Sequence, residues 1–67
     1  MITIRVNGKK VIIEHNISLA RFLSKKEIKK ESVVVLINEE IIKKNIFDTV
    51  LLKDNDKVEI LRFVSGG

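Results

Sequence analysis

The 67-residue sequence contains no cysteine, proline, tryptophan or tyrosine, and it has a single histidine, His15. Without cysteine the chain can form no disulfide bond, thiolate metal site or cysteine nucleophile, and one histidine is too few for a zinc cluster. The longest apolar run, residues 33–37, is far shorter than the roughly 20 residues of a membrane helix. We therefore expect a cytoplasmic protein with no bound metal and no membrane association.

The short length limits what the chain can do by itself. It can form one domain at most, with no room for a deep substrate cleft or a nucleotide-binding fold, and it has no glycine-rich phosphate loop. Hydrophobic residues make up 45% and charged residues 33% of the sequence, which suffices for a core and a soluble surface and argues against disorder. We expect a folded domain that is not an enzyme, binds no cofactor and is a monomer when free.

The net charge of +4 is distributed unevenly along the chain. Residues 1–30 carry eight lysines and arginines against two acidic residues, whereas residues 31–67 carry five against seven. A basic face of this kind can bind nucleic acid or an acidic partner. Because the three phenylalanines are scattered, no basic-aromatic stacking surface can be recognised, and we expect no nucleic-acid partner.

The first half of the sequence predicts a hairpin followed by a helix. Residues 2–6 alternate between apolar and polar, as in a half-buried strand, and Asn7-Gly8 is a strong turn signal because both residues tolerate positive φ. A second strand is expected at residues 11–13. Ser18 is placed to cap a helix, whose buried face has the i, i+3, i+4 spacing of apolar residues: Leu19, Phe22 and Leu23.

The second half predicts three more strands. Residues 33–37 are five consecutive strand formers, which is typical of a central strand. A short strand is expected at residues 41–42, and a last strand at residues 58–63 after a tight turn at 54–56. The apolar residues between 46 and 51 predict a brief helical turn or loop that is pinned to the core.

This order of elements, β-β-α-β-β-β, indicates an α+β fold. One helix between two hairpins favours a mixed sheet with the helix packed across one face. The simplest closed arrangement is a ubiquitin-like β-grasp, in which the last strand lies parallel to the first, although the order alone also allows a generic α+β roll. We expect residues 1–62 to form the β-grasp domain and residues 63–67 to form a flexible C-terminal tail.

Glycine is rare, and two of the three glycines, Gly66 and Gly67, are the last residues of the sequence. Two residues without side chains would let the chain thread through a narrow channel and present the α-carboxylate of Gly67 to another protein's active site. An ionised carboxylate is a poor electrophile and must be activated, most simply as an acyl-adenylate. A partner would have to bind the ATP. The alternative is a frayed tail or a cloning remnant.

Five features follow one another along the sequence. They are the first strand into Asn7-Gly8, the helix start Ser18-Leu19-Ala20 with Phe22-Leu23, the strand and turn from Val33 to Asn38, the segment from Lys53 to Ile60, and the ending Arg62-Phe63-Val64-Ser65-Gly66-Gly67. In this combination, over essentially its full length, the sequence resembles the ThiS family of ubiquitin-like sulfur carriers in thiamine biosynthesis. Family members often have glycine where Glu39 and Asn55 stand, and proline and tryptophan where Lys43 and Phe47 stand. These departures concern details of turns.

The resemblance implies a cosubstrate for other enzymes. Gly67 would be adenylated by a ThiF-like enzyme, which uses ATP, and then converted to a thiocarboxylate. The sulfur would be delivered to a ThiG-like thiazole synthase that builds the thiazole ring of thiamine. Because the sulfur is held on the backbone terminus, such a carrier needs no cysteine side chain.

Three other functions remain open at this point. A MoaD-like small subunit of molybdopterin synthase also ends in Gly-Gly and carries a thiocarboxylate. A ubiquitin-like modifier would be joined to lysines of other proteins. A β-grasp binding module, for example one for RNA, would have a Gly-Gly end that is incidental. The residues of the folded body do not separate these functions.

The alternation of side chains along strands predicts how a partner would recognise the body. If Val33, Val35 and Ile37 point toward the helix, their neighbours on the strand point to the opposite face, and so does one residue of the last strand. Exposed apolar patches usually mark a partner. We expect three residues to dock the adenylating enzyme: Val34, Leu36 and Leu61. Two are expected at the rim: Arg5 and Arg62. The tail expected to thread into the partner is Phe63, Val64, Ser65 and Gly66.

Overall fold

The structure, a computed structural model, describes residues 1–63. Along these residues, five strands, one α-helix and two short 3₁₀ helices follow one another. They are β1 (Ile2–Val6), β2 (Lys9–Ile13), α1 (Leu19–Lys25), η1 (Lys30–Ser32), β3 (Val33–Ile37), β4 (Glu40–Ile42), η2 (Lys44–Ile46) and β5 (Lys57–Arg62).

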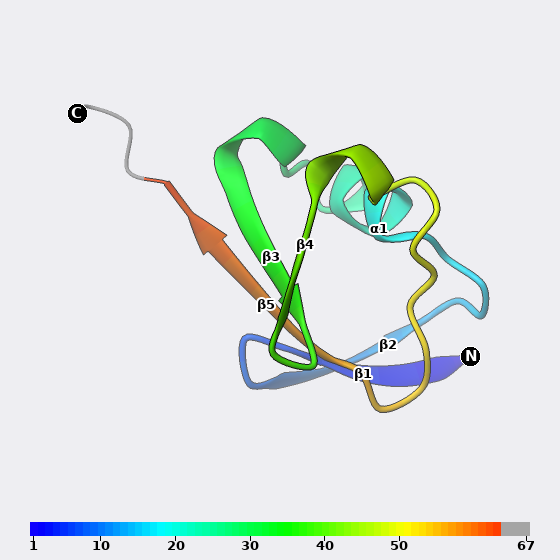
Figure 1. Cartoon of the computed structure of the whole chain (residues 1–67). Helices are drawn as coiled ribbons and strands as arrows, with labels where there is room; N and C mark the ends of the chain where they lie inside the picture. Colours follow the sequence, from blue (N-terminus) through cyan, green and yellow to red (C-terminus); the bar gives the residue numbers. More distant parts are fainter. Residues whose placement is uncertain (64–67) are drawn as a thin grey trace.

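The five strands form one mixed sheet in the order β2-β1-β5-β3-β4. The last strand, β5, lies in the centre, where it pairs parallel with β1 and antiparallel with β3. The two hairpins lie on either side of it, and α1 lies across one face of the sheet (Figure 1). The expected mixed sheet with one helix on one face is confirmed, and its topology is that of a β-grasp.

Both hairpins close through turns of two residues with positive φ at each position. The first turn has Asn7 at φ 49° and Gly8 at φ 86°, and the second has Asn38 at φ 51° and Glu39 at φ 73°. Such turns match the twist of the flanking strands, and they set which residues face one another across each hairpin. The Asn7 side chain also extends the pairing of β1 with β5, because its Oδ1 accepts from the Ile60 N–H at 2.8 Å and its Nδ2 donates to the Ile60 carbonyl at 3.2 Å.

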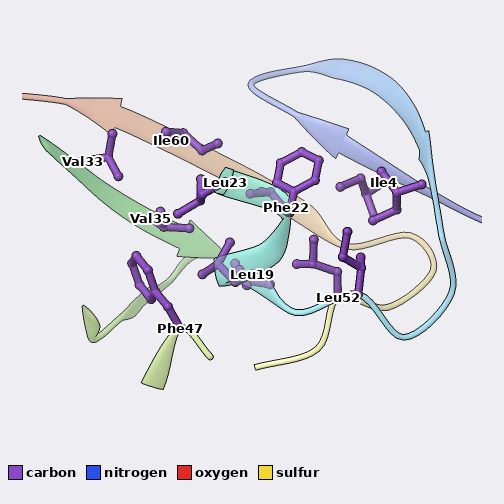
Figure 2. Close-up of a cluster of buried hydrophobic side chains, with 13 residues drawn as sticks. Ile4, Leu19, Phe22, Leu23, Val33, Val35, Phe47, Leu52 and Ile60 are labelled. Carbon is purple, nitrogen blue, oxygen red and sulfur yellow. The ribbon is translucent and has the colours of Figure 1, made fainter. Parts of the chain in front are cut away.

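The core fills the space between the sheet and α1, as Figure 2 shows. On α1 the predicted apolar face is buried, and the Ser18 hydroxyl caps the helix by accepting from the Arg21 N–H at 3.0 Å. On β3 the alternate residues are buried as expected: Val33, Val35 and Ile37. The core therefore lies entirely on the helix side of the central strands.

The segment between β4 and β5 contains the expected helical turn, η2, and is pinned to the core, but not by every one of its apolar residues. Phe47 is buried at 1% exposure, in agreement with the sequence, but Ile46 and Leu51 are exposed. The buried residue at the other end of the segment is Leu52, whose N–H donates to the Ile17 carbonyl at 2.9 Å. This hydrogen bond sets which of the adjacent leucines faces the core.

The carboxylate of Asp56 joins two loops to the start of β5. This side chain is buried, and its two oxygens accept from Asn38 Nδ2 at 3.0 Å and from the Lys53 N–H at 2.8 Å. The Asn38 Oδ1 in turn accepts from the Lys57 N–H at 3.0 Å. A buried carboxylate is tolerated only with such donors. The network therefore holds the β3–β4 turn against the central strand.

We expect Asp56→Ala to lower the free energy of unfolding by about 2–3 kcal/mol, because hydrogen bonds to a charged group are worth about 1.5–3 kcal/mol and their donors would lose an acceptor. Urea unfolding followed by circular dichroism measures this loss. Asp48→Ala is the matched control, since Asp48 is exposed, and it should change stability by less than about 0.5 kcal/mol. Equal losses for the two variants would contradict the assigned role of Asp56.

Candidate functional site

The end of β5 is where the folded body meets the segment that the sequence singles out. Four of the residues assigned to that segment lie outside the described residues, namely Val64, Ser65, Gly66 and Gly67. Phe63 is described. Its N–H donates to the Ser32 carbonyl at 3.0 Å, and Lys44 Nζ lies 5.5 Å from the centre of its ring. The sequence places the start of the tail at Phe63, but this residue still has contacts with both 3₁₀ helices of the body.

The three apolar residues expected to form a docking patch lie together on the sheet face opposite α1. Val34 on β3 and Leu61 on β5 are directly paired across the two strands. Leu61 is 56% exposed, while Val34 and Leu36 are half-buried. Residues directly opposite in an antiparallel pair have Cβ atoms about 5 Å apart, so these side chains can form one surface.

A fourth residue belongs to this surface and was not identified from the sequence. Ile41 on β4 pairs with Leu36 and is 70% exposed. The four residues, Val34, Leu36, Ile41 and Leu61, are called the outer patch below. The two-residue turn after β3 could have indicated Ile41, because such a turn determines which residue of β4 faces Leu36.

The two arginines expected at the rim lie on opposite faces of the sheet. Arg62 pairs with Val33, whose side chain is buried under α1, and it alternates with Leu61 along β5. Strand alternation therefore directs Arg62 to the helix side of the sheet. Arg5 lies on the patch side, but it pairs with Lys57 at the start of β5, while Leu61 is near the end of that strand.

Arg5 is the centre of a row of positive charges across the outer face. Its partner on β2 is Lys10 and its partner on β5 is Lys57, and all three residues are exposed. Lys57 Nζ is 3.7 Å from a carboxylate oxygen of Glu39, an exposed pair that is screened by solvent. The outer face thus has an apolar end at the outer patch, where Glu59 pairs with Leu36, and a cationic end on β2, β1 and the start of β5.

The pKa of the Glu14 carboxyl group is lowered by a neighbouring lysine. It follows β2 and forms an exposed ion pair with Lys25 on α1. The hydrogen bond from Lys25 lowers the pKa of Glu14 below its ordinary value, and the charge of Lys25 and the more distant charge of Arg21 act in the same direction. The pair links the end of β2 to the last turn of the helix.

We expect Lys25→Ala to raise the pKa of Glu14 toward its ordinary value. Because the pKa is lowered in the folded chain, the stabilisation from this pair is present above the unfolded-state pKa and is lost as the pH falls through the folded-state pKa. Carbon-13 NMR titration of the Glu14 carboxyl measures the change directly. Lys26→Ala is the control and should leave the titration unchanged. A midpoint that does not move in Lys25→Ala would refute the pairing.

Residues 1–63 offer little for other kinds of site. No three of their histidine, aspartate and glutamate side chains come together as a metal-binding group would require. Over the same residues, no helix is both long enough and apolar enough to cross a membrane. The outer patch and the cationic row are chemically distinctive surfaces of the described residues.

Comparisons with known proteins identify relatives along almost the whole chain. The sequence model of the ThiS family matches residues 3–67. The crystal structure of the thiamine biosynthesis protein ThiS from Geobacter metallireducens is similar with a TM-score of 0.85 and 32% identity, covering 98% of this chain and 100% of that one. A solution NMR structure of a thiamine biosynthesis protein from the same organism gives a TM-score of 0.79 at 32% identity, covering 98% and 88%. The uncharacterized protein ycf40 of Porphyra purpurea is 30% identical over 66 residues, which are 98% of this chain and 93% of that protein.

Proposed function

Because the chain belongs to the ThiS family, we propose that it is a sulfur carrier protein of thiamine biosynthesis. The observation that carries the proposal is the family match over residues 3–67, which includes the Gly-Gly pair. The likeness to the Geobacter metallireducens ThiS, over 98% of this chain and 100% of that one, supports it. In this role the protein is a cosubstrate on which partner enzymes act.

The reaction proposed for Gly67 proceeds in two steps. Its carboxylate oxygen attacks the α-phosphorus of ATP held by a ThiF-like enzyme, and pyrophosphate leaves as the acyl-adenylate forms. Sulfur at the oxidation level of hydrosulfide then attacks the carbonyl carbon and displaces AMP, which leaves a thiocarboxylate and releases a proton. Activation is needed because the terminal carboxylate, with an ordinary pKa near 3.5, is fully ionised and unreactive at neutral pH.

The thiocarboxylate then donates its sulfur to a ThiG-like thiazole synthase for the formation of the thiazole ring. This chain supplies the reactive end and the surface by which the partners recognise it, and the activating enzyme supplies the ATP. Gly66 and the residues from Phe63 to Ser65 would thread the end into the partner's active site.

The outer patch is the surface proposed to dock the activating enzyme. Leu61 and Ile41 are more than half exposed, and exposed apolar residues that form one surface favour burial against a partner. Leu61 lies on β5, two residues before Phe63. Contacts made here would offset the entropy cost of ordering the tail, about 1–2 kcal/mol per residue for the backbone. Arg5 would add a charged contact at the far end of the same face.

The test of the proposed function is the intact mass of the protein isolated from its native host. Replacement of one terminal oxygen by sulfur adds the mass difference of the two elements and consumes no side chain. We expect this heavier form, and we expect it to disappear when the ThiF-like enzyme is removed. Detection of only the unmodified chain, or of the chain linked to lysines of other proteins, would refute the proposal.

A further inference from the structure

The sheet has an open edge at β2. This strand is the first in the sheet order and pairs only with β1 among the residues that the structure describes. The turn at Asn7-Gly8 closes on the pair Val6 and Lys9, and bonded and non-bonded pairs alternate from there along an antiparallel hairpin. The backbone N–H and C=O groups of Lys10 and Ile12 therefore point away from β1, toward the open edge.

An apolar groove runs beside this edge, between β2 and α1. Its volume is about 390 Å³, and its lining is contributed by both elements. The apolar residues that line it are Met1, Val11, Ile12, Ile13, Ile17 and Phe22. Val11 and Ile13 point to the helix side of the sheet, whereas the side chain of Ile12, which pairs with Thr3 and is 63% exposed, lies on the outer face. Met1 is 83% exposed. Backbone groups that can form a ladder thus lie next to apolar side chains that can receive those of another strand.

The charge around the groove is positive. Lys25 and Lys26 line its helix side, and Lys26 Nζ lies 5.7 Å from the centre of the Phe22 ring. The one acidic residue of the lining, Glu14, is paired with Lys25. The strand β2 itself begins with Lys9 and Lys10, both exposed. A segment that entered the groove would meet several cations and one carboxylate that is already neutralised.

We propose that the groove between β2 and α1 binds an extended, acidic segment of another protein, which adds a strand to β2. Apolar side chains on alternate positions of the segment would enter the groove, and its acidic residues would lie beside the lysines. A second copy of this chain fits poorly, because pairing two β2 edges would bring the lysines of both strands together, a known means of preventing edge pairing.

This inference is independent of the proposed sulfur transfer. The groove is at the β2 edge of the sheet, while the outer patch is on β5, β3 and β4. The two surfaces are separated by β1, so one protein could bind at the groove without covering the end of β5. A negative result for either surface would leave the other unaffected.

The experiment uses the full chain, labelled with nitrogen-15, and a short synthetic peptide with valine or isoleucine at alternate positions and aspartates at both ends. We expect shifts of amide NMR signals concentrated at residues 10–14 and 22–26. Lys26→Glu should weaken binding about tenfold, which is the effect of one lost favourable charge contact combined with repulsion. Lys43→Glu is the control, because Lys43 follows β4, the strand at the opposite edge of the sheet. This variant should bind the peptide as tightly as the unchanged chain does.

Two altered peptides test the backbone pairing and the charge contacts separately. A peptide that is N-methylated at every residue between the aspartates cannot donate to β2 from either edge, and we expect it to bind at least about tenfold more weakly. A peptide with lysines in place of the aspartates should also lose binding. The proposal is wrong if none of the acidic peptide binds at concentrations up to about 1 mM, if its shifts fall on the outer patch, or if the N-methylated peptide binds equally well.

Discussion

A chain that lacks Gly67, or that carries one alanine after it, is expected to be adenylated at least about 100-fold more slowly than the unchanged chain. Either change moves the reacting carbon by about 3.5 Å along the tail, which exceeds the tolerance of a positioned reaction. Pyrophosphate release in the presence of ATP and a ThiF-like enzyme measures the rate.

An alanine added before Met1 is the matched control for this experiment. It lengthens the chain equally, at a residue that is 83% exposed, and it should leave the rate unchanged. The thermal unfolding of all three variants should be the same as that of the unchanged chain, because the core consists of residues between Ile4 and Ile60. If the chain extended after Gly67 is adenylated at the ordinary rate, its carboxylate is not the reacting group.

The second large effect is expected at the outer patch. Leu61→Asp should weaken binding to the activating enzyme by about 2 kcal/mol or more, roughly 30-fold, because a charged group would have to be desolvated within an apolar contact. Ile41→Asp should act in the same direction, since Ile41 faces Leu36 in the patch. Titration calorimetry measures the affinity, and steady-state kinetics should show a higher KM with little change in kcat.

Leu51→Asp is the control for the patch. Leu51 is 46% exposed against 56% for Leu61, and it lies in the loop between η2 and β5, where it pairs with Ser18. The same apolar-to-charged change there should leave the affinity for the activating enzyme within about twofold. Circular dichroism must show that each variant is folded. Equal losses of affinity in Leu61→Asp and Leu51→Asp would mean that the outer patch is not the docking surface.

These two predictions concern different parts of the same proposed reaction. A change at Gly67 alters the position of the reacting atom and should lower kcat, whereas a change at Leu61 alters recognition and should raise KM. If both variants changed only KM, the tail would contribute to binding and not to the positioning of the carboxylate. The division between a reacting end and a recognising body would then have to be abandoned.

The sequence by itself determined the local structure wherever a short pattern has a single steric solution. Asn7-Gly8 indicated a turn because both residues tolerate positive φ, and both adopt it. Ser18 indicated a helix start because its hydroxyl can accept from the Arg21 N–H, and it does so. Residues 33–37 indicated a strand whose successive side chains point to opposite faces, but because all five are apolar, only the structure shows that Val33, Val35 and Ile37 face the core.

Tertiary structure decided the features that depend on which distant segments meet. Ile41 joins the outer patch only because β4 pairs with β3 in one register, and Arg62 faces the helix side because it is paired with Val33. Leu52 is buried and Leu51 is not because a backbone hydrogen bond with Ile17 sets the orientation of a loop that has no periodic pattern.

The groove and the buried hydrogen-bond network of Asp56 also depend on which distant segments meet. The groove needs β2 to be an edge strand and α1 to lie beside it, and the carboxylate of Asp56 needs donors from Asn38 and Lys53. These contacts cannot be predicted from residue spacing along the chain, because each depends on the sheet order that brings β5 between the two hairpins. Local sterics thus account for the elements, and the long-range pairing of strands decides which surfaces they present.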